Sequence, residues 1–299
     1  MKISLSKNLR KLALVFAAAA ALGGCQRYEE PYEKCVQTSD AQGFQQQFPD
    51  LYNSFKKIES LPHSGRHLAA QMKDPANAIP TCVANDVDGG AAGEFIPELV
   101  KLRMRSGEVD ARAYTHEMFH AGQHINGALK LLGSPSLAIE DNMAGNMLVE
   151  ASAVGYSFMV YKEMDKVEPG AYANFTKTWY SFDMKPHFDA AYAKALPRGE
   201  EKALEAGGKA VVEALLRGVN EDWSHTYAVR SAENSYQSTL PEVRQNAGYS
   251  EARTEYFRQA GKVSPTVNIT PDWMLQKNPE QGITTHLAKS GIVITYKFN

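Results

Sequence analysis

The chain of 299 residues has little of several features that mark specialised classes of protein. Its 3 cysteines are too few for a disulfide-dense scaffold or for a zinc site made of cysteines alone. The 32 basic and 34 acidic residues give a formal net charge of -2, so no strong field favours nucleic acid as a partner. The sequence also lacks a G-x-G-x-x-G fingerprint, a P-loop and an internal repeat. What remains, 43% hydrophobic and 22% charged residues, is the composition of an ordinary globular protein.

The apolar run near the N-terminus is also short. Residues 12–24 carry no charge, and they follow a basic start that contains Lys2, Lys7, Arg10 and Lys11. A run of about 13 residues falls short of the roughly 20 that a membrane-spanning helix needs. The layout therefore favours a signal peptide over residues 1–24.

The run ends with Leu22-Gly23-Gly24-Cys25, which resembles the lipobox of bacterial lipoproteins. The resemblance implies that Cys25 becomes the lipidated first residue of the mature chain and anchors it to a membrane. Gln26 at the next position favours, by the same resemblance, the outer membrane facing the periplasm. The alternative is an ordinary cleaved signal followed by a stray cysteine.

Without Cys25, the chain retains the even pair Cys35 and Cys82. An exported protein meets conditions that permit disulfides, so we expect these two residues to form one. The bridge would close a loop of about 47 residues and contribute roughly 3 to 4 kcal/mol on the loop-entropy model. Two buried free thiols are the alternative.

The mature chain divides by composition into a polar start, a loop-rich stretch and a helical remainder. Residues 25–60 predict a tether that leads into an amphipathic helix around Phe48–Ile58, and residues 61–98 predict loops with strand residues at Val83, Phe95 and Ile96. Helical patterns then cover residues 99–104, 111–132, 137–165, 171–195, 200–217 and 220–236, and a terminal strand is expected at 291–296. The expected fold class is α+β, helix-dominated, with a small sheet before residue 111.

The pattern H-E-x-x-H occurs at His116, Glu117 and His120. It lies in the stretch Ala111–Ala121, which contains no proline or glycine and has the pattern of a helix. At 3.6 residues per turn, His116 and His120 lie one turn apart on one helix face, so both imidazoles can reach one ion. Glu117 projects about 100° away, beside the position that the two ligands leave open. This spacing predicts a hydrolytic zinc site in which Glu117 is the general base.

A catalytic zinc usually has three protein ligands, so a third is required. Asn126 stands where metzincins place their third histidine, which excludes that arrangement. His124 follows His120 by one turn, but three residues at successive turns span about 12 Å of helix axis, too far for all three to meet one ion. We therefore expect His124 to be a supporting or ordinary polar residue.

Glu150 is the preferred third ligand. It borders an apolar stripe of the following helix, and a metal would compensate the charge of a carboxylate buried there. The stripe consists of Met143, Met147, Ala151, Val154 and Phe158. A glutamate that reaches water from the edge of the stripe is the alternative. Glu140 and Asp141 are further candidates, although their place after the turn at Pro135 is typical of acids in a first helical turn.

His116-Glu117-x-x-His120 followed by Glu150 on the next helix resembles the gluzincin metallopeptidases over about residues 80–165. The stretch Thr115–Gln123 is also similar to a group of bacterial metallopeptidase domains, largely uncharacterised, in which H-E-x-x-H-A-x-Q recurs. The resemblance implies a zincin-like domain over residues 61–240, a C-terminal extension over 241–299, zinc as cofactor and a peptide or protein as substrate. In such enzymes a strand before the motif helix pairs with the extended substrate, a role that falls on Gly93–Ile96. The chain lacks the fuller N-E-x-x-S-D pattern of the best-known members around the third ligand.

Peptide hydrolysis also needs a donor for the developing oxyanion. His225 and Tyr227 on a later helix, and Tyr156 on the helix of Glu150, are the candidates, and the sequence does not choose among them. The function predicted is that of a lipid-anchored zinc metallopeptidase of the bacterial envelope. The alternative is a non-catalytic envelope lipoprotein with a structural zinc site or no metal.

Overall fold

A computed structural model describes residues 32–77, 79–87, 91–107, 110–129, 139–224, 226–227, 231, 251–264, 266–275, 284–287 and 292–295. Residues 33–299 group as a unit separate from residues 1–32, and the elements below belong to this second unit. The predicted signal peptide and Cys25 lie outside the described residues. The second unit is a helix-dominated α+β structure with a small mixed sheet before the motif helix, as the sequence predicts.

The sheet has four strands in the order β1-β2-β4-β3, which are Glu33–Gln37, Pro80–Ala84, Lys101–Arg105 and Gly93–Ile96. Strands β2 and β4 run parallel, whereas the β1–β2 and β3–β4 pairs are antiparallel. One face is apolar and buried by helices, because alternate residues of each strand point the same way. Val36, Thr81, Leu102 and Met104 lie on this buried face. Strand β3 pairs with β4 and lies at one end of this strand order.

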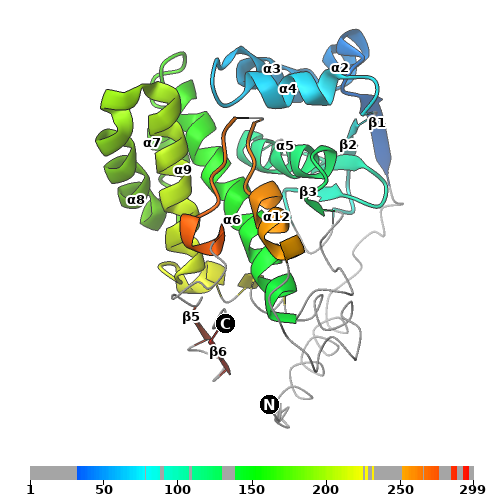
Figure 1. Cartoon of the computed structure of the whole chain (residues 1–299). Coiled ribbons are helices and arrows are strands. Elements are labelled where there is room, and N and C mark those ends of the chain that lie inside the picture. Colours follow the sequence, from blue (N-terminus) through cyan, green and yellow to red (C-terminus); the bar gives the residue numbers. More distant parts are fainter. Residues whose placement is uncertain are drawn as a thin grey trace, which may run out of the picture. The chain divides into compact units, whose positions relative to one another are not determined.

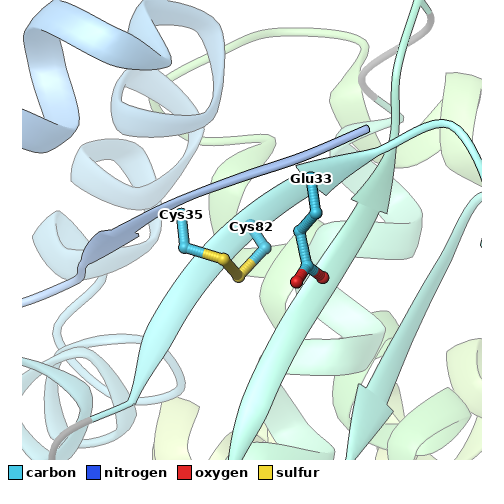
Figure 2. A group of neighbouring side chains, drawn as sticks. All are labelled: Glu33, Cys35 and Cys82. Carbon is cyan, nitrogen blue, oxygen red and sulfur yellow. A yellow bond between two sulfur atoms is a disulfide. The ribbon is translucent and has the colours of Figure 1, made fainter. Parts of the chain in front are cut away.

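Cys35 and Cys82 form the predicted disulfide, which closes a sequence separation of 47 residues. The two residues lie directly opposite each other in the β1–β2 register, on the face of the sheet that carries polar side chains (Figure 2). Cys35 is exposed and Cys82 is buried. The bond fastens the edge strand β1 to its neighbour.

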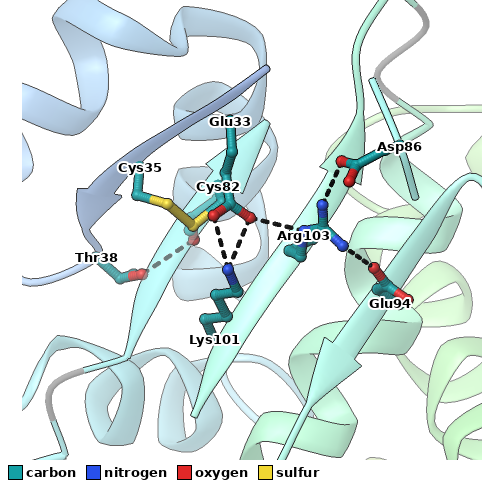
Figure 3. Close-up of a disulfide and its surroundings, with 9 residues drawn as sticks. Glu33, Cys35, Thr38, Cys82, Asp86, Glu94, Lys101 and Arg103 are labelled. Atoms are coloured by element: carbon teal, nitrogen blue, oxygen red, sulfur yellow. Dashed lines mark hydrogen bonds and ion pairs between the residues drawn. A yellow bond between two sulfur atoms is a disulfide. The ribbon is translucent and has the colours of Figure 1, made fainter. Parts of the chain in front are cut away.

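A single arginine joins three segments of the same polar face. Arg103 on β4 contacts Glu33 on β1 at 2.7 Å and Glu94 on β3 at 2.6 Å, and it also pairs with Asp86, which follows β2 (Figure 3). Lys101 binds both carboxylate oxygens of Glu33, at 2.8 and 2.7 Å. Because the Arg103 side chain is only 12% exposed, its charge is held in a partly desolvated position where these contacts fix strand order.

Three short helices follow β1: α2 (Ala41–Gln47), α3 (Pro49–Ser60) and α4 (Arg66–Lys73). The turn between α3 and α4 is tied to the buried carboxylate of Glu163, which accepts the backbone N–H of His63 at 3.0 Å and of Ser64 at 2.9 Å, and the Ser64 hydroxyl at 2.6 Å. Three donors satisfy the buried carboxylate, so it serves as an anchor for this turn.

Helix α5 (Ala111–Ile125) contains the H-E-x-x-H motif and has a defined signal at each end. The Asp110 carboxylate accepts the backbone N–H of Arg112 at 2.8 Å and caps the N-terminus. At the other end, Gly127 has a φ of +82° and its N–H binds the carbonyl of His124, while the N–H of Ala128 binds that of Gln123. This is a Schellman motif, so the helix ends at Ile125 rather than near residue 132.

Helix α6 (Ile139–Met164) lies between α5 and a group of later helices (Figure 1). These are α7 (Ala171–Phe175), α8 (Trp179–Ala195) and α9 (Glu200–Leu216), with the 3-10 turn Leu196–Arg198 between the last two. A Cβ on Gly155 of α6 would lie 2.8 Å from the carbonyl oxygen of Gly208 on α9. Glycine is therefore required for this close helix contact. None of the described helices combines the length and hydropathy needed to cross a bilayer.

The C-terminal part adds helix α12 (Glu251–Ala260), the 3-10 turn Asp272–Leu275 and a hairpin of β5 (Thr284–Leu287) and β6 (Ile292–Thr295). Strand β6 confirms the predicted terminal strand. Helix α12 packs on α6, where the buried ring of Tyr256 occupies the space that a side chain at Gly145 would fill. The carbonyl of Ala260, the last residue of α12, accepts a hydrogen bond from Gln123, so α12 also contacts the motif helix.

Three local predictions are wrong. Residues 99–104 were expected to form a helix, but Lys101–Arg105 is strand β4, whose alternate residues Leu102 and Met104 are buried. Helix α4 lies in the stretch predicted as loops, and the predicted tether contains strand β1 and helix α2. Leucine, methionine and arginine are good helix formers, but in a five-residue segment the pairing with two neighbouring strands outweighs this preference.

Candidate metal centre

Helices α5 and α6 bring the three predicted ligands together. The Nε2 atoms of His116 and His120 lie 3.1 Å apart, and each lies 3.5 Å from the Glu150 Oε2 atom. The His120 and His116 side chains are 10% and 15% exposed, whereas that of Glu150 is 29% exposed, so water reaches the group from the side of Glu150. Among the described residues, no further histidine, cysteine or acidic side chain joins this cluster.

The three atoms have the spacing that a tetrahedral ion requires. Ligands at about 2.0 to 2.1 Å from zinc, with tetrahedral angles, stand roughly 3.3 Å from one another. The observed separations of 3.1, 3.5 and 3.5 Å match this value without rearrangement of either helix. The donor set of two imidazoles and one carboxylate is also one that catalytic zinc uses, with the fourth position left open.

The protein alone gives this cluster strong electrostatic coupling. Burial by itself would lower the pKa of His120, but the Glu150 carboxylate, with smaller contributions from Glu117 and Gln123, raises it to about 9. Burial would raise the pKa of Glu150, and the two histidines reverse this effect and hold it well below its usual range. The Glu150 carboxylate and the His120 imidazole therefore favour each other's charged forms.

Glu117 lies beside the cluster and is 9% exposed. Burial raises its pKa, although His116, His120 and the backbone N–H of Phe95 act in the opposite direction. A Cβ on Gly93 would lie 3.2 Å from the Cγ of Glu117, so strand β3 approaches this side chain closely. The carboxylate is thus held between the motif helix and the edge strand.

Within the described part of the chain, the edge of β3 that does not pair with β4 faces Glu117. The carbonyl of Ala92 accepts the N–H of Arg105 and so points toward β4. Backbone groups alternate along a strand, so those of Gly93 and Phe95 point to the opposite edge. The hydrogen bond from the Phe95 N–H to Glu117 agrees with this direction. Main-chain donors and acceptors therefore line one side of the candidate centre.

Gln123 belongs to this site, and the sequence analysis gave it no role. Its Oε1 atom lies 2.8 Å from Nδ1 of His120, and its Nε2 donates to the carbonyls of Val149 and Ala260. A position three residues after His120 lies on the same helix face, which is the signal that could have identified it.

The other candidates are placed elsewhere or not described. His124 packs its ring against Phe95, 5.5 Å between centroids, and does not join the ligand group, in line with the helix geometry. Tyr156 stacks on Phe119 at 4.8 Å, and Tyr227 packs on Trp223 at 4.8 Å. His225 and the side chains of Glu140 and Asp141 lie outside the described residues. The oxyanion donor stays unassigned.

A second group of potential ligand atoms, Glu33, Cys35 and Cys82, has a different character. Both sulfur atoms are used in the disulfide, and Lys101 and Arg103 bind the carboxylate of Glu33 and lower its pKa. With its sulfurs bonded and its carboxylate paired, this group has no free ligand to offer an ion.

Comparisons of the chain with models of protein families, with curated proteins and with solved structures find no match.

Proposed function

We propose that the protein is a zinc metallopeptidase that hydrolyses peptide bonds. One observation carries the proposal. Three ligand atoms from two helices converge at tetrahedral spacing, and the carboxylate of Glu117 lies beside them without joining the ligand group. A structural zinc site is usually closed by four protein ligands, whereas three ligands leave a position for a reactant.

The residues of the chain divide the chemical work among them. His116, His120 and Glu150 would hold the ion. Zinc, when bound, supplies a Lewis acid that activates water and polarises a peptide carbonyl. Glu117 takes a proton from the attacking water and delivers it to the amine nitrogen as the carbon–nitrogen bond breaks. The raised pKa that burial gives Glu117 suits a group that must both accept and release this proton.

Strand β3 supports a peptide as the substrate. An extended chain can add to the edge of a sheet by main-chain hydrogen bonds. The Phe95 N–H already binds Glu117, so the backbone groups of Gly93 and the carbonyl of Phe95 are those that could receive a peptide at this edge. A peptide bound there would pass close to Glu117. Such binding depends on backbone rather than side chains, which favours unfolded segments or flexible loops as substrates.

The proposal includes export and lipidation of the chain. The N-terminal pattern and Cys25 are the basis for a lipid anchor in the bacterial envelope, facing the periplasm. The Cys35–Cys82 disulfide supports export, because disulfides persist in oxidising compartments and are rare in the cytosol.

Replacement of Glu117 by glutamine separates hydrolysis from mere metal binding. We expect Glu117→Gln to bind zinc as the unaltered protein does, because the ligands remain, and to cleave an unfolded protein substrate about 10² to 10⁴ times more slowly. Zinc content and cleavage rate are measured on the same preparations. Glu168→Gln, which changes an exposed acid paired with Lys57, serves as the matched control and should keep full activity.

Two outcomes would reject this function. If the unaltered protein binds zinc but cleaves no unfolded substrate, the metal is structural. If Glu117→Gln cleaves as fast as the unaltered protein, the observed hydrolysis comes from another site or a contaminant.

A further inference from the structure

Gln123 is fully buried and has a hydrogen-bond partner for each end of its amide. The Oε1 atom contacts Nδ1 of His120 at 2.8 Å. The Nε2 atom donates to the Val149 carbonyl at 3.2 Å and to the Ala260 carbonyl at 2.7 Å. A fully buried amide with every group satisfied is a fixed structural element rather than a surface side chain.

The partners determine which way the amide faces. The carbonyls of Val149 and Ala260 can only accept, so the amide NH₂ must point at them and the amide oxygen must point at His120. That oxygen can only accept as well. Nδ1 of His120 must therefore carry a hydrogen, and in the neutral ring Nε2 then carries the lone pair. Nε2 is the atom that faces His116 and Glu150.

The same side chain connects both ligand-bearing helices to the C-terminal part. Val149 directly precedes Glu150 on α6, so the hydrogen bond to its carbonyl fixes the backbone next to the third ligand. Ala260 ends α12 and is 137 residues away along the chain. Gln123 thus holds α5, α6 and α12 in register at the metal cluster.

We infer that Gln123 is a positioning residue that fixes the ring orientation and tautomer of His120 and thereby sets the affinity of the centre for a divalent cation. This inference rests on the proposed zinc site. It adds that the acceptor oxygen, and not the bulk of the side chain, is the feature that matters. It also makes the C-terminal helix α12 a structural part of the metal centre.

Two substitutions separate the acceptor from the packing. Gln123→Met keeps the approximate volume and removes the acceptor. Gln123→Glu, with its carboxyl protonated in this buried position, keeps an oxygen that accepts the Nδ1 hydrogen and a hydroxyl that donates to one of the two carbonyls. Loss of such a partner of a metal-binding histidine typically weakens metal binding about 10- to 100-fold. We expect that loss for Gln123→Met and a change of less than about threefold for Gln123→Glu. The dissociation constant for zinc is measured by competition with a chelator.

The control is Ser64→Ala, which removes a buried hydrogen bond to Glu163 away from the cluster. It should lower the melting temperature of the metal-free protein and leave zinc affinity unchanged. A purely structural role for Gln123 predicts instead that both Gln123 variants lose stability and keep their zinc affinity. That result would overturn the inference.

A measurement on the unaltered protein covers the case in which Gln123→Met does not fold. In the zinc-loaded protein, the His120 Nδ1 hydrogen should give an NMR signal that is protected from exchange with water, because it is bound to a fully buried oxygen. Rapid exchange of this hydrogen would overturn the inference while zinc binding itself stands. Absence of zinc binding by the unaltered protein would overturn the proposed function and this inference together.

Discussion

A single acidic side chain determines where the motif helix begins. Asp110 accepts the backbone N–H of Arg112 at 2.8 Å and also binds its guanidinium at 2.7 and 2.9 Å. Burial would raise the pKa of Asp110, but the side chain and backbone of Arg112 and the N–H of Ala113 lower it. Because the ionised form makes these bonds, the start of α5 depends on the charge of Asp110.

This dependence gives a pH-sensitive prediction. Asp110→Ala should reduce the free energy of unfolding at pH 7 by about 1 kcal/mol, as loss of an N-cap usually does. The folded-state pKa lies below the unfolded value of about 3.9, so the contribution is complete above that value and declines as the pH falls through the folded-state pKa. Denaturant unfolding of both proteins at pH 7 and pH 3 checks this. A difference that is equal at the two pH values would contradict the electrostatic part of the account.

The residues of the candidate centre differ in how far the sequence could identify them. His116, Glu117 and His120 follow from spacing on one helix. Glu150 required a helix-to-helix contact that periodicity only suggests, and its place 3.5 Å from both histidines comes from the fold. The spacing of Gln123 from His120 places it on the same helix face, but the orientation of its amide depends on two carbonyls, one of them 137 residues away, which the sequence does not reveal.

At the scale of elements, the contact between α6 and α9 depends on two small residues. A Cβ added at Gly155 would lie 2.8 Å from the backbone oxygen of Gly208 and 3.0 Å from Val212. Helix α9 is thus the partner of α6 at Gly155. Because the nearest atom is part of the α9 backbone, a side chain at Gly155 would force the two helices apart.

Gly155→Ala should therefore lower the free energy of unfolding by about 1 to 3 kcal/mol, the usual cost of overpacking a core. Although alanine favours helix more than glycine does, by about 1 kcal/mol, the clash with backbone outweighs this gain. Gly218→Ala is unsuitable as a control because Gly218 has a φ of +77°. The exposed residue Lys202 on α9 provides one: Lys202→Ala should change stability little. An increase in melting temperature for Gly155→Ala would contradict the close contact.

The long elements were predictable and the short ones were not. Helices α6 and α9 follow from sustained helical patterns with breaks at both ends. The segment Lys101–Arg105 alternates partly buried and fully buried residues over five positions, which is too short for composition to separate a strand from a helix. Strand β1 pairs with β2 across 43 or more residues, a contact that local sequence does not contain.

For the molecule as a whole, the disulfide is the main covalent constraint among the described residues. It joins β1 to β2 across 47 residues and lies on the polar face of the sheet, away from the ligand-bearing helices. The double variant Cys35→Ser, Cys82→Ser should lose about 4 kcal/mol of unfolding free energy on the loop-entropy model. Zinc affinity should be retained, since no ligand lies on β1. The unaltered protein treated with a dithiol reductant should unfold like the double variant, and equal stability of oxidised and reduced forms would contradict this role.

The zinc content of purified protein tests the central claim most directly. Metal analysis after equilibration with limiting zinc should find about one ion per chain in the unaltered protein and in Glu117→Gln. His120→Ala and Glu150→Ala should each retain much less, because each loses one of three ligands. Equal zinc in all four proteins would show that the ion binds elsewhere and would contradict the metal centre formed by α5 and α6.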